Sequence, residues 1–268
     1  SGAASLKERA FGGCGMERVR LPAGVQILDY MFSGCTNLET LVCGGGEFPD
    51  KGTFDLSGAV LFGDWAFEAC GAEKVRLPAG VQISDGMFQS CASLKTLVCG
   101  NGAFSENVID LSGYTNDLFG WGAFYGSGVK EVRLSAYVPP SEFMFYDCAE
   151  LKTLAFIGGR VAPIIGEHAF GGVSDSGTLY YPRDAADYTK GTFGAPDLSN
   201  WDFIKASGPE VVSQPSAQTE TEGEVAIFQF DVNGSPLVYQ WQQSVDGTSW
   251  TNLSDGAGYA GVATDMLF

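Results

Sequence analysis

The sequence predicts an elongated repeat solenoid of short parallel strands and short helical turns, followed by an incomplete all-β domain. Three observations carry this prediction. A phenylalanine-centred pattern recurs, with Phe11, Phe67 and Phe124 lying 56 and 57 residues apart. Glycine is frequent, at 37 of 268 residues without a collagen-like period, which indicates many tight turns. Near residue 206 the composition changes and the pattern ends.

Each predicted coil reads apolar-x-x-x-Ala/Met-Phe-x-x-Cys and then runs into a short alternating strand. Such a unit cannot bury its apolar side alone, whereas stacked copies can. The strands should therefore form a parallel sheet, in which Val19 and Leu21 point inward and Arg20 points outward. The Phe segments are expected to form short helical turns on the opposite side. The anchors are Phe11, Phe32, Phe67, Phe88, Phe124, Phe145 and Phe170.

The solenoid is expected to span residues 1–206, and its last part lies at about residues 178–205. A last strand over 178–181 would be followed by an amphipathic helix around 184–188. Trp201 would then cover the open end of the apolar stack. Residues 206–209, Ala-Ser-Gly-Pro, are predicted to be a linker.

The repeated residues resemble the BspA-like, or Treponema-type, leucine-rich repeats of bacterial surface proteins. The resemblance covers roughly residues 5–181 and departs from the pattern at Ser127 and Val173, where the cysteine is missing. It implies a right-handed leucine-rich-repeat solenoid, located extracellularly or on a bacterial cell surface, that takes part in adhesion. It also implies a cap that closes the solenoid, for which residues 178–205 are the candidate. The export signal and the anchor would lie outside this sequence.

Residues 209–268 resemble an immunoglobulin-like sandwich. Trp241 would be the core tryptophan of strand C, and Phe230 would stand where the first cysteine is usual, so no intersheet disulfide is expected. A complete sandwich needs about 100 residues. We therefore interpret this domain as truncated and expect the natural protein to continue beyond residue 268.

The charge of the chain excludes several classes of partner. The formal net charge is −17, with only 15 lysines and arginines, which disfavours binding to nucleic acid or to anionic lipid. No run of about 20 apolar residues is present, so this segment is not expected to insert directly into a membrane.

The residues that commonly carry catalysis or bind metal follow the repeat instead. The seven cysteines keep its spacing and form no Cys-x-x-Cys motif, so we interpret them as small apolar core residues. Stacked coils could still bring pairs within disulfide reach. His168 is the only histidine and occupies a repeat position. We therefore predict no enzyme activity, no metal site and no cofactor.

The outward row of the predicted sheet is the candidate binding face. It includes six residues that we take as candidates, namely Arg20, Asp55, Arg76, Asp110, Arg133 and Tyr180. One interpretation is a site for an acidic ligand, such as a sulphated or sialylated glycan or an acidic protein patch. The other, which we favour, is neutralisation between neighbouring strands, with Asp55 beside Arg76 and Asp110 beside Arg133.

The sequence thus predicts a monomeric binding or adhesion protein that contacts a protein or glycan of a host or a neighbouring cell. One alternative is a non-catalytic module that targets carbohydrate. A cluster of exposed aromatic residues on one face would favour it, and Trp121, Tyr125, Tyr137 and Tyr146 are its candidates. The other alternative is a structural spacer.

Overall fold

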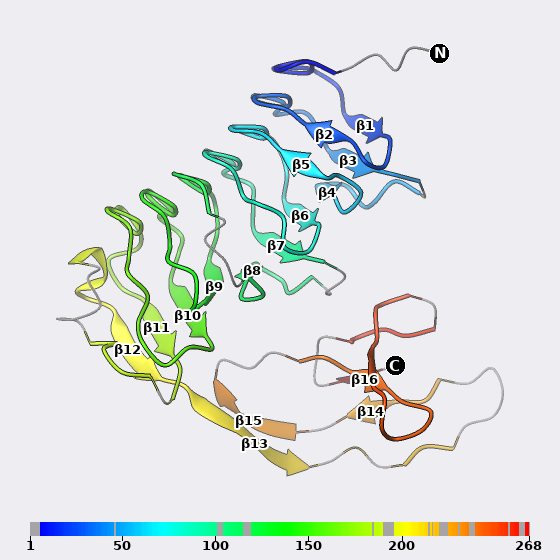
Figure 1. The fold of residues 1–268 in the computed structure, drawn as a ribbon, viewed down its shortest axis with the longest axis vertical. Helices are drawn as coiled ribbons and strands as arrows, with labels where there is room; N and C mark the ends of the chain where they lie inside the picture. Colours follow the sequence, from blue (N-terminus) through cyan, green and yellow to red (C-terminus); the bar gives the residue numbers. More distant parts are fainter. Residues whose placement is uncertain are drawn as a thin grey trace.

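The protein is described by a computed structural model (Figure 1). The structure describes residues 6–45, 47–100, 104–114, 119–183, 185–189, 196–213, 215, 217–219, 225–229, 231–235, 239–256, 258–262 and 266–267.

A ten-stranded parallel sheet forms one side of the solenoid, as the alternating pattern predicts (Figure 1). Its strands pair in chain order, and between them in the sequence lie two short strands of the solenoid that are not part of it. The ten are β1 (Arg18–Leu21), β3 (Thr40–Cys43), β4 (Thr53–Asp55), β6 (Lys74–Leu77), β7 (Thr96–Cys99), β8 (Val108–Leu111), β9 (Glu131–Ser135), β10 (Thr153–Ile157), β11 (Thr178–Tyr181) and β12 (Asp202–Lys205). These two solenoid strands, β2 (Gln26–Ile27) and β5 (Leu61–Phe62), pair with each other in parallel.

The core lies between this sheet and the turns. In β1, Val19 and Leu21 are buried and Arg20 is exposed, which confirms the predicted alternation. The anchor phenylalanines stack ring on ring through the core, with centroids 5.1–5.9 Å apart from one anchor to the next and nearly parallel planes. Six of the seven are fully buried, and Phe11, in the first coil, is half-buried.

The Phe segments are not helical, and in this respect the prediction is wrong. Around Phe67, the amide groups of Glu68 and Cys70 donate within the segment, whereas those of Trp65, Phe67 and Ala69 donate to carbonyls of the next coil. An α-helix would use every amide internally. Half of the donors are instead used to join coils, so the segments are stacked turns that extend the hydrogen bonding to the side opposite the sheet.

The backbone on either side of each anchor explains this alternation. Residues two before and two after every anchor Phe have positive φ, between 51° and 71°. Several of them are not glycine, including Tyr30, Trp65, Phe143 and His168. At these residues the left-handed conformation orients every second peptide group along the stacking axis, toward the neighbouring coil. The peptide groups of an unbroken right-handed helix cannot adopt this orientation.

The cap differs from its prediction in one element. In the described part of residues 182–201 the only helical segment is the 3₁₀ turn η1 (Pro196–Leu198), so the helix expected around 184–188 is absent there. Trp201 is fully buried, and its Nε1 donates to the Ser174 carbonyl at 2.9 Å. It lies directly against Gly177, where a Cβ would come within 2.8 Å of the indole ring.

The C-terminal part is made of antiparallel pairs. Only Ala206 separates β12 from β13 (Ser207–Ser213), so the predicted linker at 206–209 is mostly strand. The pairs are β13 with β15 (Asp231–Ser235), β14 (Phe228–Gln229) with β18 (Met266–Leu267), and β16 (Gln242–Gln243) with β17 (Thr251–Asn252). Trp241 packs against the buried Leu253, Val262 and Leu267, as a core tryptophan would, while Phe230 lies outside the described residues. These pairs do not establish an immunoglobulin-like sandwich.

Candidate binding faces

The predicted outward row is in register on the sheet. Cross-strand pairing joins Arg20 to Val42, Val42 to Asp55 and Asp55 to Arg76, and further on it joins Asp110 to Arg133. Ala155 follows Arg133, and Tyr180 follows Ala155. The six candidate residues therefore lie on one face of one sheet, which we call the strand face.

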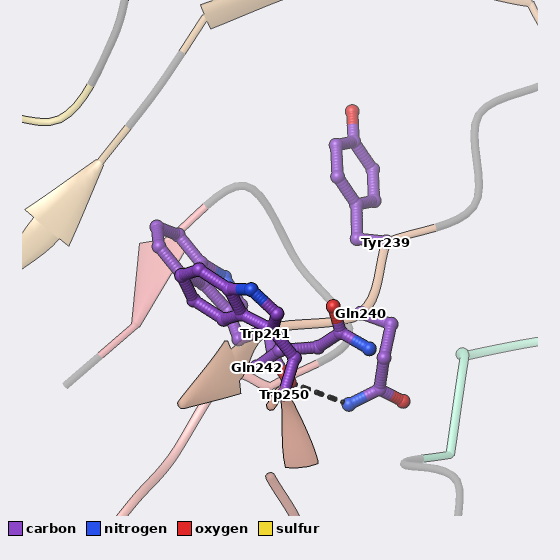
Figure 2. Close-up of a pocket in the computed structure, with 5 residues that line it drawn as sticks. All are labelled: Tyr239, Gln240, Trp241, Gln242 and Trp250. Atoms are coloured by element: carbon purple, nitrogen blue, oxygen red, sulfur yellow. Dashed lines mark hydrogen bonds between the residues drawn. The ribbon is translucent and has the colours of Figure 1, made fainter. Parts of the chain in front are cut away.

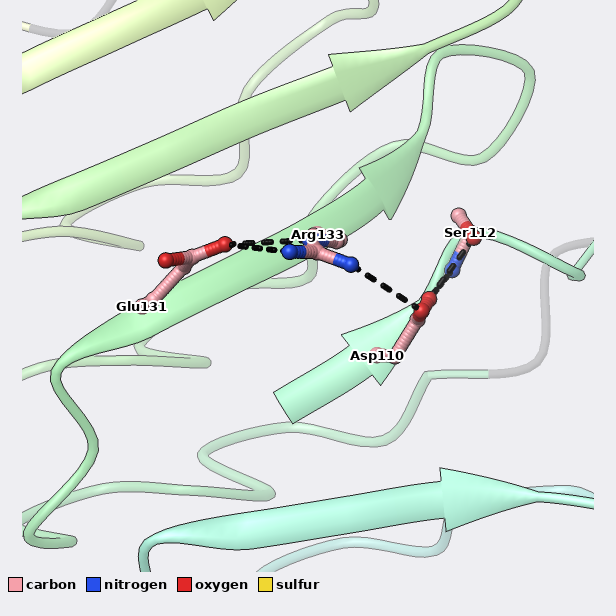
Figure 3. A network of polar contacts seen from close by, with 4 residues as sticks. All are labelled: Asp110, Ser112, Glu131 and Arg133. Atoms are coloured by element: carbon pink, nitrogen blue, oxygen red, sulfur yellow. Dashed lines mark hydrogen bonds and ion pairs between the residues drawn. The ribbon is translucent and has the colours of Figure 1, made fainter. Parts of the chain in front are cut away.

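Arg133 is neutralised within the chain (Figure 3). Its guanidinium group lies 3.0 Å from Glu131 Oε1 and 4.0 Å from Asp110 Oδ2. The Arg133 side chain is only 16% exposed. The expected pairing of Asp110 with Arg133 is present, and two carboxylates surround this one arginine. This end of the strand face is therefore not a basic site.

The two aspartates of the outward row, Asp55 and Asp110, accept hydrogen bonds from the turns that follow their strands. Asp55 Oδ1 accepts hydrogen bonds from the Ser57 amide at 3.1 Å and the Ser57 hydroxyl at 2.6 Å. Asp110 Oδ1 accepts the same two bonds from Ser112, at 3.0 and 2.7 Å (Figure 3). Each aspartate thus fixes the turn after its strand, which accounts for the recurrence of Asp-Leu-Ser.

The first strand is different, because its arginines are held by an aromatic ring. The guanidinium groups of Arg18 and Arg20 lie 4.2 and 4.6 Å from the centroid of the Phe48 ring. Arg20 also donates to the Gly44 carbonyl at 3.0 Å. Both arginines are exposed. A cation–π contact positions a guanidinium group while leaving its charge in place.

The same arrangement recurs 56 residues later in the sequence. Arg76 lies 4.8 Å from the Phe104 ring centroid and donates to the Gly100 carbonyl at 2.8 Å. Phe48 and Phe104 were missed by the sequence reasoning, which followed only the anchors. A signal was available, because these two phenylalanines are 56 residues apart, as are Cys43 and Cys99 before them.

Residues 1–49 and 53–111 match the family model of the BspA type leucine rich repeat region, in six copies. Over these residues the chain is similar to that family. Neither the curated proteins nor the solved structures contain a match to this chain. Proteins with BspA-type repeats are often surface-associated and often bind proteins.

The repeated coils continue in the structure beyond the matched residues. Phe124, Phe145 and Phe170 stack as the earlier anchors do, and β9, β10 and β11 extend the same sheet. Among the described residues, no helix is long and apolar enough to cross a bilayer.

A second candidate site lies in the C-terminal part (Figure 2). A cleft of about 390 Å³ is lined by Tyr239, Gln240, Trp241, Gln242 and Trp250. Nε2 of the Gln240 side chain donates to the Trp241 and Leu253 carbonyls, at 2.8 and 3.0 Å, and this side chain is therefore engaged in holding the backbone. Trp250 is 59% exposed and is the ring most available to a ligand.

Two pairs of cysteines of the BspA-like coils meet across neighbouring coils. The Sγ atoms of Cys14 and Cys35 are 3.1 Å apart, and those of Cys70 and Cys91 are 3.6 Å apart. Burial raises the pKa of Cys35 and of Cys91, and the neighbouring thiol raises both further. All seven cysteines are free thiols in this structure, so both pairs are held as neutral thiols in contact.

Oxidation should join these two pairs and spare Cys148. Treatment of the folded protein with a small uncharged oxidant such as diamide should form Cys14–Cys35 and Cys70–Cys91 disulfides, since each pair already has its sulfurs in contact on adjacent coils. Cys148 faces Ser127 Oγ at 3.4 Å and has no such partner there. Peptide mapping by mass spectrometry under non-reducing conditions checks this.

The matched variant is Ser127→Cys, which should add a third pair with Cys148. Recovery of Cys14 and Cys91 as free thiols after oxidation of the wild type would contradict the predicted pairing.

Proposed function

We propose that this chain is a secreted or cell-surface binding protein that contacts a protein or glycan of a host or a neighbouring cell through its strand face. The single observation that carries the proposal is the pair of exposed guanidinium groups, Arg18 and Arg20, that flank Phe48. The BspA-like repeats support the surface location and the binding role.

Three properties of this pair favour recognition of an acidic partner. The Phe48 ring holds both guanidinium groups in place, and the Gly44 carbonyl also holds that of Arg20, so less side-chain entropy is lost when a ligand binds. Guanidinium groups bind carboxylate and sulphate oxygens in bidentate geometry. In a chain of net charge −17, a local positive site also distinguishes one surface from the rest.

The test is a binding screen against purified extracellular-matrix proteins and sulphated or sialylated glycans, at low and physiological salt. For a ligand found in this way, Arg20→Ala should weaken binding about tenfold or more, because a charge-assisted hydrogen bond is lost. The effect should shrink as salt is added.

Arg133→Ala is the matched control, since it removes the same charge from the same row at an arginine already paired with Glu131 and Asp110. Equal losses in the two variants would indicate a general charge effect and contradict the proposed site. If the chain binds none of these ligands at micromolar concentration, the result would favour the alternative that it is a structural spacer.

A further inference from the structure

A second surface lies on the turns, on the opposite side of the solenoid from the sheet (Figure 1). Five aromatic side chains from three successive coils touch one another there, and we call them the turn-face platform. They are Trp121, Tyr125, Phe143, Tyr146 and His168.

The five rings form one continuous group. Phe143 is at its centre, with ring centroids 5.4 Å from Trp121, 5.4 Å from Tyr146 and 5.3 Å from His168. Tyr125 stacks on Tyr146 at 5.1 Å. Across three coils the group extends about 10 Å along the stacking axis, given a spacing of about 4.8 Å per strand.

These rings are not core residues. Trp121 is 39% exposed, the His168 side chain is 51% exposed, and the other three are half-buried, whereas the anchor Phe beside each is fully buried. A contiguous exposed aromatic surface of this kind marks a binding site more often than scattered apolar residues do.

The charges around the platform restrict its ligand. The turns at 119–126, 141–148 and 165–172 contain no lysine or arginine, and they carry the carboxylates Glu142, Asp147 and Glu167. Asp147 accepts a hydrogen bond from the Tyr125 hydroxyl at 3.3 Å, and Glu167 lies 3.5 Å from His168 Nε2. Nucleic acids stack on aromatic rings but require neutralised phosphates. Sulphated and sialylated glycans are repelled for the same electrostatic reason.

We propose that the turn-face platform binds an uncharged polysaccharide. The flat face of a pyranose ring carries C–H groups with small positive charge, which pack against the negative faces of aromatic rings. Sugar hydroxyls donate to carboxylates in charge-assisted hydrogen bonds. The platform supplies both groups over about 10 Å, and it is separate from the acidic-ligand site proposed on the strand face.

The test is affinity electrophoresis of the full chain in gels containing hydroxyethylcellulose, laminarin or mannan, with heparin as the charged comparison. One or more of the neutral polysaccharides should retard the protein, and high salt should not abolish the retardation. Trp121→Ala and Tyr146→Ala should each weaken binding about tenfold or more, from the loss of an aromatic contact. Tyr146→Phe, which keeps the ring, should bind nearly as the wild type does.

Two controls separate this site from the others, and circular dichroism checks that every variant is folded. Trp250→Ala removes the exposed ring of the C-terminal cleft, and Arg20→Ala alters only the strand face. Neither should change the retardation. Failure of all three neutral polysaccharides to retard the chain would overturn the proposal. The proposal would also be overturned if Trp250→Ala lost binding while Trp121→Ala bound as the wild type does.

Discussion

Phe67→Ala should cost about 3–5 kcal/mol of unfolding free energy, as truncation of a fully buried aromatic residue does. Phe67 has no exposed surface, and its ring contacts Phe32, Phe54, Phe62 and Phe88 at 5.6–6.2 Å. Each coil of a solenoid is stabilised mainly by its neighbours. A cavity here therefore weakens two coil interfaces at once. Urea denaturation followed by circular dichroism measures the loss.

The control is the equivalent change in the first coil. Phe11 is half-buried, and its ring stacks on Phe32 alone among the described rings. Phe11→Ala should therefore cost much less than Phe67→Ala, although the two residues occupy the same repeat position. Similar costs for the two variants would show that the aromatic stack does not set the stability of the solenoid.

The repeat pattern was enough to predict the sheet, because burial and strand alternation depend on residue type alone. The order of strands and the outward row from Arg20 to Tyr180 both follow from it. The turns could not be predicted in the same way. The spacing of Ala-Phe-x-x-Cys is compatible with a helix, and nothing in one coil reveals that half of its amides bond to the next coil. That information lies in the stacking, as does the left-handed backbone at Tyr30 and Trp65.

The candidate site was predicted in part for a similar reason. Register placed Asp110 beside Arg133, as the alternation required. It could not show that Phe48 holds Arg18 and Arg20, because strand register does not determine which loop side chain packs against a strand. The four aromatic residues named as candidates for carbohydrate binding were also predicted only in part. Trp121, Tyr125 and Tyr146 come together, whereas Tyr137 belongs to the turn after β9 and lies against Gly158.

Glycine four residues after the anchor shows how stacking gives different roles to the same repeat position. Gly15, Gly71 and Gly128 follow Phe11, Phe67 and Phe124 at this spacing. A Cβ on Gly128 would lie 2.1 Å from the Ala92 carbonyl oxygen of the preceding coil, and one on Gly71 would lie 2.7 Å from that of Thr36. A Cβ on Gly15 would meet nothing within 4 Å. Its coil is the first of the described stack, so no preceding turn lies against it.

Gly128→Ala should therefore destabilise the protein by about 1–3 kcal/mol or more, the usual cost of overpacking, because the obstructing atom is backbone and cannot rotate away. Gly15→Ala should be neutral or slightly stabilising, since alanine has less freedom to lose on folding. Thermal unfolding of the two variants beside the wild type provides the measurement. If both substitutions lowered the melting temperature equally, conformation rather than close coil contact would explain these glycines. A loss confined to Gly128→Ala would show that coil-to-coil backbone contact limits what the repeat can accept at this position.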